Sequence, residues 1–135
     1  MGRSLLILLD THVVVWLAGE EHRLSSKAKA AVEEARRTEQ GLGISDFTLY
    51  ELSTLFRKKQ FILTISPESF LSEVENRFVV LPITSHICIG ANSLPAGYPK
   101  DPGDRIIGAT ALVEGLTLVT ADAQIRKSRA IPTIW

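Results

Sequence analysis

The chain has 135 residues, the size of one ordinary domain, and we expect a single domain over residues 1–135. Its 15 Lys and Arg residues balance its 15 Asp and Glu residues, so the formal net charge is zero. This balance excludes the broad positive field of a protein that coats DNA nonspecifically, and any contact with nucleic acid must therefore be local.

The sequence contains one cysteine, Cys88, which rules out an intramolecular disulfide and favours a reducing compartment. The apolar stretch near the N-terminus is interrupted by Asp10 and His12, and it lacks the small-residue pattern of a cleavage site. We therefore expect neither a signal peptide nor a membrane span, and we expect a soluble protein of the cytoplasm.

Short apolar runs alternate along the chain with segments of helical periodicity. Two helix starts are marked by a capping side chain followed by proline, at Ser66-Pro67 and Asp101-Pro102. Strands are predicted at residues 5–9, within 41–46, and at 78–83, 116–119 and 132–135; helices are predicted at 11–18, 26–40, 47–60, 67–76, 84–93 and 102–114, and a basic turn at 126–129. This alternation predicts an α/β fold of three layers, α/β/α, with a short, mainly parallel sheet.

Carboxylates follow two of the predicted strands. Asp10 comes directly after the first strand, and Asp122 follows the strand at 116–119 by way of Thr120. Ligands bind at the C-terminal edge of a parallel sheet, so both side chains are placed for chemistry. Glu51 lies one turn into the helix after the second strand, on the same side of the sheet, although a helical glutamate is usually just a solvent-facing residue.

Two aspartates compete for a further position at this edge. Asp101 is the natural N-cap of its helix, a task that occupies its side chain, while Asp104 lies one turn further along. Asp104 can also reach back to the cap, as an acidic residue does in a capping box. We favour Asp104 as the ligand, with Asp101 as the cap or an outer group that orients the site.

Four carboxylates gathered at one edge would repel each other unless a multivalent cation compensates their charge. The proposed ligands are Asp10, Glu51, Asp104 and Asp122. All-oxygen ligands with no Cys or His pattern favour Mg²⁺ or Mn²⁺ over Zn²⁺. A pair of such ions is common in phosphodiester hydrolysis, and the sequence leaves open whether one or two bind here.

These motifs resemble those of the PIN-domain nucleases, specifically the VapC-type toxins of bacterial toxin–antitoxin pairs. The resemblance spans nearly the whole chain, and it rests on Asp10-Thr11, Ser45 with Glu51-Leu52, Asp101 to Arg105, and Leu118 to Asp122, in the family's order. It implies an endoribonuclease dependent on Mg²⁺ or Mn²⁺, whose acidic site is Asp10, Glu51, Asp104 and Asp122, with Thr11 and Thr120 orienting ligands or water.

The resemblance also implies partners. It predicts a homodimer that is inhibited by a cognate VapB-type antitoxin, whose C-terminal segment fills the active-site groove. Two positions depart from the family pattern, because His12 stands where many members have asparagine and Gly103 where close relatives often have phenylalanine. These departures concern the fit of the substrate more than the acidic site.

Two alternatives remain open at this point. A catalytically degenerate PIN module would bind RNA or a protein partner without cutting, although the intact acids count against it. A phosphoacceptor domain would also place an aspartate after its first strand. A dehalogenase-like phosphatase, however, requires a second acid where His12 stands, and a receiver domain requires an acid pair and a late Lys-Pro that are absent.

Overall fold

The computed structural model describes residues 7–59 and 64–135. Strands and helices alternate along the chain, in the order β1 (Ile7–Leu9), α1 (Thr11–Gly19), the 3₁₀ turn η1 (Glu21–Arg23), α2 (Ser26–Arg37), β2 (Leu42–Ser45), α3 (Asp46–Arg57), α4 (Pro67–Arg77), β3 (Val79–Leu81), α5 (Ser85–Asn92), α6 (Pro102–Glu114), β4 (Thr117–Val119), α7 (Ala123–Ser128) and β5 (Thr133–Ile134). None of the helices in the described residues is long and apolar enough to cross a membrane.

The strands form one sheet in the order β3-β2-β1-β4-β5, and every neighbouring pair is parallel. In the register of the central strands, Leu8 lies between Gly43 of β2 and Leu118 of β4. All carboxyl ends of the strands therefore meet at one edge, and the end of β1 lies between those of β2 and β4. The predicted parallel sheet is confirmed.

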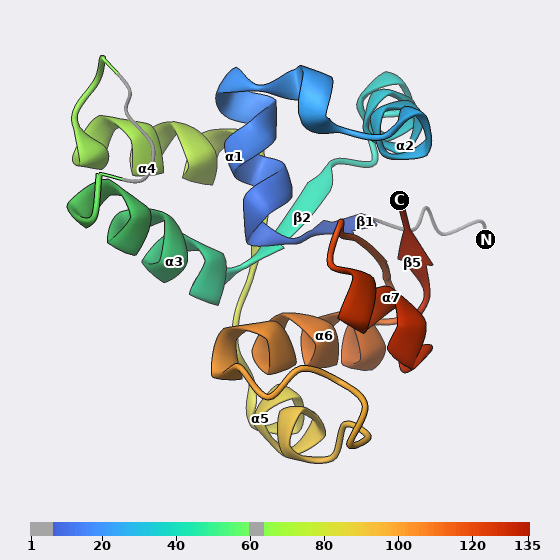
Figure 1. Ribbon diagram of the computed structural model, residues 1–135. Helices are drawn as coiled ribbons and strands as arrows, with labels where there is room; N and C mark the ends of the chain where they lie inside the picture. The colour runs from blue at the N-terminus through green and yellow to red at the C-terminus, as the bar shows by residue number, and fades with distance from the viewer. Residues whose placement is uncertain (1–6, 60–63) are drawn as a thin grey trace.

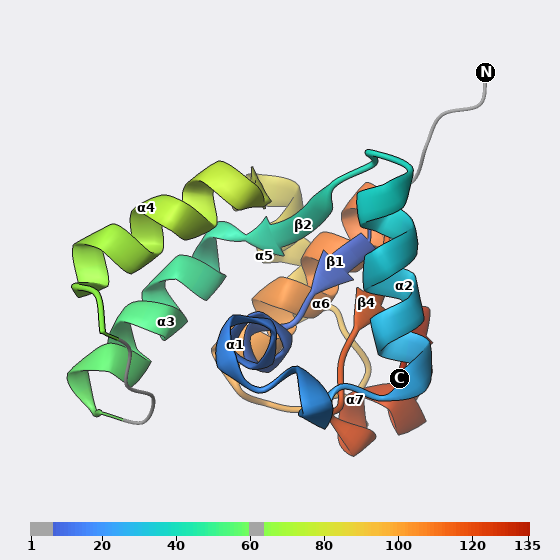
Figure 2. The same cartoon turned by 90° about the horizontal axis from the view of Figure 1, so that it is seen from above.

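Helices cover both faces of this sheet. Successive strand residues point to opposite faces, so Leu9 packs into one core cluster and Leu8 into another. The cluster of Leu9 includes buried side chains of α1, α2, α3 and α4, and that of Leu8 includes those of α6 and α7. Figure 1 shows α1 and α2 above the strands and α5, α6 and α7 below them, and Figure 2 shows the same layers from above. The predicted α/β/α arrangement is confirmed.

Several element boundaries differ from the predictions by a few residues; helix α3, for example, ends at Arg57. Two of the differences have a clear local reason. Helix α2 ends at Arg37 rather than near residue 40, because Glu39 adopts a left-handed φ of 60° and the N–H of Gln40 bonds back to the carbonyl of Ala35. Strand β3 ends before Pro82, which has no N–H to donate to the sheet.

A difference of another kind lies near the C-terminus. The predicted basic turn is the six-residue helix α7, which was missed because so short and polar a segment has no helical period to detect. The expectations for residues 5–6 and for residue 60 lie outside the described residues.

Candidate active site

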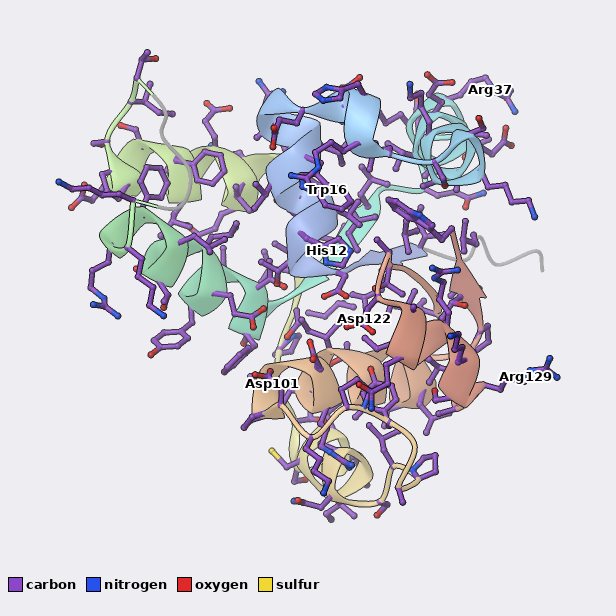
Figure 3. All side chains as sticks on the ribbon, in the orientation of Figure 1. His12, Trp16, Arg37, Asp101, Asp122 and Arg129 are labelled. Carbon is purple, nitrogen blue, oxygen red and sulfur yellow. The ribbon has the colours of Figure 1, made fainter. Side chains whose placement is uncertain are left out.

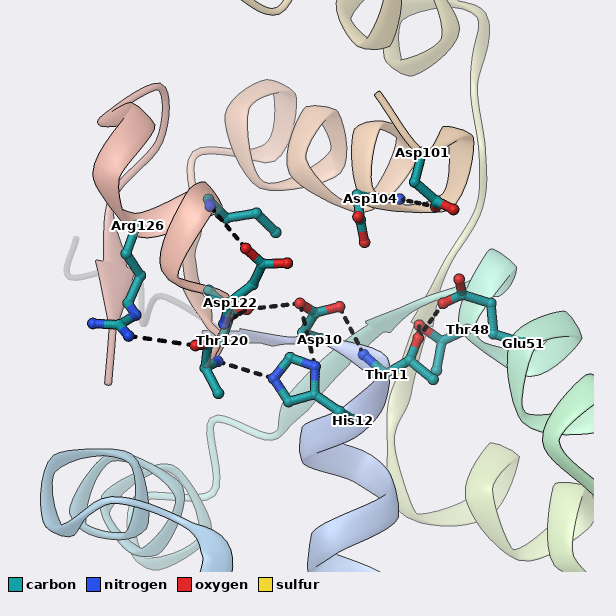
Figure 4. Close-up of polar contacts among 12 residues, drawn as sticks. Asp10, Thr11, His12, Thr48, Glu51, Asp101, Asp104, Thr120, Asp122 and Arg126 are labelled. Carbon is teal, nitrogen blue, oxygen red and sulfur yellow. Dashed lines mark hydrogen bonds and ion pairs between the residues drawn. The ribbon is translucent and has the colours of Figure 1, made fainter. Parts of the chain in front are cut away.

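The predicted acids gather at the carboxyl edge of the sheet. Asp10 follows β1 and Asp122 follows β4, while α3 supplies Glu51 and the first turn of α6 supplies Asp104. Figure 4 shows Asp10 in the middle of the group, with the carboxylate of Asp104 pointing toward it. The structure therefore brings together residues from four different elements, although whether they bind metal stays a prediction.

Asp10 is the most constrained of these acids, with only 5% of its surface exposed. Its Oδ1 accepts a hydrogen bond from the backbone N–H of Thr11 at 2.9 Å, which caps α1. Its Oδ2 accepts from the hydroxyl of Thr120 at 2.7 Å. The same hydroxyl oxygen accepts from the N–H of Asp122 at 3.1 Å, so Thr120 links the ends of β1 and β4.

Asp122 has a second task that the sequence analysis did not assign to it. Its Oδ1 accepts a hydrogen bond from the N–H of Ile125 at 3.0 Å and so caps α7. Within the described residues no hydrogen bond reaches its Oδ2. One carboxylate oxygen of Asp122 therefore fixes the helix, and the other is available to a ligand.

Glu51 is oriented by a chain of hydroxyl groups. The hydroxyl of Thr11 donates to Glu51 Oε1, and the Oγ1 atoms of Thr11 and Thr48 lie 3.1 Å apart. Each hydroxyl has one proton, so Thr48 donates to Thr11 when Thr11 donates to Glu51. Burial raises the pKa of Glu51, and Asp10 and Asp101 add to this rise, which the hydrogen bond from Thr11 opposes.

Thr48 was not among the predicted site residues. It is fully buried and lies one helical turn before Glu51 on α3. Residues three positions apart share a face of a helix. A threonine three positions before Glu51 was therefore the signal available in the sequence.

Asp101 and Asp104 have different contacts in the first turn of α6, and the role of Asp104 as a ligand stays a prediction. Asp101 Oδ1 accepts from the N–H of Asp104 at 3.1 Å and caps α6, so the prediction of Asp101 as the cap is confirmed. The side chain of Asp104 makes no hydrogen bond with the described residues and does not reach back to the cap. Burial raises the pKa of Asp104 to about 7, and the carboxylates of Asp10, Asp101, Asp122 and Glu51 add to the rise.

Two glycines allow the first turns of α6 to pack this closely. A Cβ atom on Gly103 would lie 2.5 Å from a carboxylate oxygen of Glu51 and 2.7 Å from the ring of Phe47. A Cβ on Gly108 would lie 2.1 Å from the hydroxyl of Tyr98, which donates to the backbone carbonyl of Asp104 at 2.8 Å. The missing side chain at Gly103 thus leaves space for Glu51 and Phe47 in this chain.

His12 also joins the ends of β1 and β4. Its Nε2 accepts a hydrogen bond from the N–H of Ala121 at 2.9 Å, and its Nδ1 lies 3.7 Å from Asp10 Oδ2. Burial lowers the pKa of His12 more than Asp10 and Asp122 raise it. A neutral ring whose Nε2 accepts must hold its proton on Nδ1, facing Asp10. No sequence signal could have paired two residues 109 positions apart.

The donor chemistry fits a hard divalent cation. Among residues 7–59 and 64–135, no group of three or more His, Cys, Asp or Glu is close enough in this arrangement to hold a metal ion. The gathered oxygens are nevertheless carboxylates, and their mutual repulsion contributes to the raised pKa of Asp104. The donors are therefore suitable, and binding would require their carboxylates to move closer together.

Comparison with known proteins identifies similar chains. The PIN domain family matches residues 7–130. Ribonuclease VapC22 of Mycobacterium tuberculosis (strain ATCC 25618 / H37Rv) is 35% identical over 131 residues, which are 96% of this chain and 98% of that protein.

Solved structures share the fold. DNA-bound VapBC from Salmonella typhimurium has a TM-score of 0.68 and 24% identity, over 96% of this chain and 97% of that chain. VapBC2 from Rickettsia felis, bound to a DNA fragment from the promoter, has a TM-score of 0.69 and 16% identity over the same shares. At these identities the likeness concerns the fold alone.

The first prediction concerns the charge of Asp104 in metal-free protein. The pKa of Asp104 is about 7 in the folded state, above its usual value of 3.8. The carboxyl group therefore adds to the free energy of unfolding below about pH 4, and this contribution is lost as the pH rises through about 7. Asp104→Asn should therefore raise the free energy of unfolding at pH 8 by on the order of 1 kcal/mol, allowing for solvent screening, and by much less at pH 4.

Urea denaturation in the presence of a chelator at the two pH values measures this difference. Glu33→Gln, at an exposed position of α2, is the control for removing one negative charge. A gain from Asp104→Asn that is equal at both pH values would contradict the assignment.

The second prediction concerns the cap of α6. Asp101→Ala removes the acceptor for the N–H of Asp104 and should lower the free energy of unfolding by ~1 kcal/mol. Asp101→Asn is the matched variant, because asparagine can accept the same bond while removing the same charge. Thermal denaturation of both proteins measures the difference, and equal stability of the two variants would argue against the cap.

Proposed function

This chain belongs to the PIN-domain family, and we propose that it is a metal-dependent endoribonuclease, the toxin of a toxin–antitoxin pair. The convergence of Asp10, Glu51, Asp104 and Asp122 at one sheet edge is the observation that carries this proposal. The chain is 35% identical to a VapC ribonuclease over nearly the full length of both proteins, which supports the same activity. The family match over residues 7–130 overturns the phosphoacceptor alternative.

We propose that these carboxylates hold Mg²⁺ or Mn²⁺. The bound ion would supply Lewis-acid activation and charge neutralisation for hydrolysis of an RNA phosphodiester bond. The hydroxyl of Thr120 fixes Asp10 Oδ2, and the hydroxyl of Thr11 orients Glu51. Asp101 holds the first turn of α6 in place, and with it the backbone of Asp104.

The raised pKa of Asp104 ties this site to pH. At a pKa of about 7, part of the protein carries a proton on this carboxyl group at neutral pH. The carboxyl group must release that proton before its oxygens can bind a cation fully, so affinity for the ion should rise with pH through about 7. Glu51, whose pKa is raised mainly by burial, adds to the same trend.

The proposed partners follow from the relatives. Both solved structures described above are VapBC complexes, and we propose that this chain is likewise neutralised by a VapB-type antitoxin. An Arg or Lys of that antitoxin would pair with the site carboxylates.

We also propose a homodimer, supported by the exposed apolar side chains Ile89, Leu112 and Val113 on the packed pair α5 and α6. We propose the cytoplasm as its location, because a single cysteine, Cys88, favours a reducing compartment.

A catalytically degenerate PIN module is the remaining alternative. It would bind RNA or a partner through the same groove without hydrolysis. The hydrogen bonds to the site carboxylates argue against it. Hydroxyl groups of Thr11, Thr48 and Thr120 fix the positions of Glu51 and Asp10, and a module that only binds would not need carboxylates oriented in this way. A cleavage assay with metal separates the two functions.

The third prediction concerns the requirement for metal. Cleavage of single-stranded RNA should need Mg²⁺ or Mn²⁺ and disappear in excess chelator, because the carboxylates cannot act on a phosphate without a cation between them. Asp104→Asn should reduce the cleavage rate at least about 100-fold, while Glu33→Gln should leave it unchanged. Unchanged cleavage in chelator would refute the metal mechanism, and binding without cleavage at every metal concentration would favour the degenerate module.

The fourth prediction concerns toxicity. Expression of the protein alone should arrest bacterial growth, and co-expression with the small protein encoded by the neighbouring reading frame should relieve the arrest. Asp10→Asn should abolish the arrest, since the central carboxylate of the site is lost. Growth curves with immunoblots for protein level measure this, and an equally toxic Asp10→Asn protein would mean that the arrest does not come from this site.

A further inference from the structure

The groove that contains the acids has a second wall of different chemistry. Its volume is about 370 Å³, and the side chains around it are Asp10, Thr11, His12, Val15, Trp16, Glu20, Arg23, Glu51, Leu55 and Asp104. The acids Asp10, Glu51 and Asp104 lie on one side of His12, whose Nδ1 is 3.7 Å from Asp10 Oδ2. Trp16 and Arg23, with Glu20 paired to Arg23, form the rest of the lining. Neither the acidic site nor the proposed hydrolysis accounts for the aromatic rings and the arginine.

Arg23 is held in a defined position at this wall. Its guanidinium carbon lies 4.4 Å from the centre of the Trp16 ring, and its NH1 nitrogen lies 3.5 Å from a carboxylate oxygen of Glu20. About half of the Arg23 side chain, 49%, is exposed. A guanidinium group resting on an aromatic ring keeps its N–H groups at its edge, where they can bind a phosphate.

Trp16 is fixed in turn by its neighbours. Its ring centre lies 4.9 Å from that of His12 and 5.7 Å from that of Trp135. Figure 3 shows His12 and Trp16 on successive turns of α1, above Asp122. The rings of His12, Trp16 and Trp135 therefore form one preorganised aromatic surface. Two of them lie on α1, the helix that Asp10 caps.

The charges in the groove explain why RNA needs this wall. The carboxylates repel the phosphates of RNA, and a cation at the acidic site can compensate only the phosphate that it contacts. Among the described side chains that line this groove, Arg23 is the one Lys or Arg. Within the groove it is therefore the group able to hold a phosphate other than the one being cleaved.

We propose that Arg23, Trp16 and His12 form a nucleotide-binding subsite beside the acidic cluster. Arg23 binds the phosphate of a nucleotide next to the cleaved bond, and the ring surface of Trp16 and His12 stacks its base. The subsite rests on the proposed ribonuclease function. It requires a single-stranded substrate, because only an unpaired nucleotide can turn its base onto a protein ring.

The opposing explanation is purely structural. Helix α1 packs against η1, and the contact of Arg23 with Trp16 could simply hold the two together. In that case loss of Arg23 would change stability and leave RNA affinity alone. Binding and stability must therefore be measured on the same variants.

The test uses Arg23→Gln with Arg37→Gln as its matched control. Both arginines pair with a glutamate three residues earlier, and both are at least about half exposed. Arg37 lies at the end of α2, away from His12 and Trp16 in Figure 3. Both changes are made in the Asp104→Asn protein so that RNA is not cut. Fluorescence anisotropy with a labelled single-stranded RNA in Mg²⁺ measures the affinity at several salt concentrations.

We expect Arg23→Gln to weaken binding about tenfold and to reduce the slope of log affinity against log salt by about 0.7, the value for one phosphate contact with a single strand. Arg37→Gln should change neither quantity. Arg23→Lys should keep the salt slope, because it keeps the charge. Trp16→Leu should weaken binding with an unchanged slope, and Trp16→Phe should retain most of the affinity.

Each outcome is decisive. Equal affinity and equal salt slope for Arg23→Gln and Arg37→Gln would overturn the subsite, and so would a fall in the melting temperature of Arg23→Gln without a change in slope. The ribonuclease function would survive either result if the unsubstituted protein cuts RNA. If that protein neither binds nor cuts RNA, the proposed function fails, and the subsite fails with it.

Discussion

Repulsion between carboxylates at the carboxyl edge of the sheet is the constraint on which the rest of the structure depends. Asp10 is nearly fully buried, and no Lys or Arg ion pair of the described residues neutralises it. Neutral donors hold it instead, the N–H of Thr11 and the hydroxyl of Thr120. Neutral donors fix the positions of the oxygens without cancelling their charge, and the uncancelled charge contributes to the raised pKa of Asp104. An edge built in this way retains its attraction for a cation.

Helix capping places three of the acids. Asp10, Asp101 and Asp122 cap α1, α6 and α7 with one carboxylate oxygen each. The positive end of each helix dipole favours the negative charge of its cap, so the same local interaction that starts the helix also steadies an acid at the sheet edge. Asp104 differs, because it makes no cap and carries the strongly raised pKa. Substitutions of Asp101 and Asp104 therefore distinguish the effect of losing a helix cap from the effect of losing a charge in the site. At Asp10 one substitution changes both.

Local signals made much of this predictable from the sequence. Apolar runs followed by an acid predicted that β1 ends before Asp10 and β4 before Asp122, and the Asp-Pro pair predicted the cap of α6. Contacts set by the packing of distant elements could not be predicted. The bond from Ala121 to His12 depends on the pairing of β4 with β1, and the approach of Tyr98 to Gly108 depends on how the loop after α5 folds back onto α6. No pattern in one segment of the chain encodes that placement.

Helix α1 connects the acidic site to the aromatic wall beside it. Asp10 caps this helix, and His12 and Trp16 lie on one face of it, so the distance from the carboxylates to the rings is set by the helix itself. If a substrate contacts both the carboxylates and the rings, helix α1 sets the distance between its cleaved phosphate and its stacked base. A helix fixes this distance more rigidly than a loop would. One residue inserted between His12 and Trp16 would turn the Trp16 ring by ~100° about the helix axis while leaving Asp10 at the end of β1. The spacing within α1 is therefore a constraint on the substrate that is separate from the constraint on the acids.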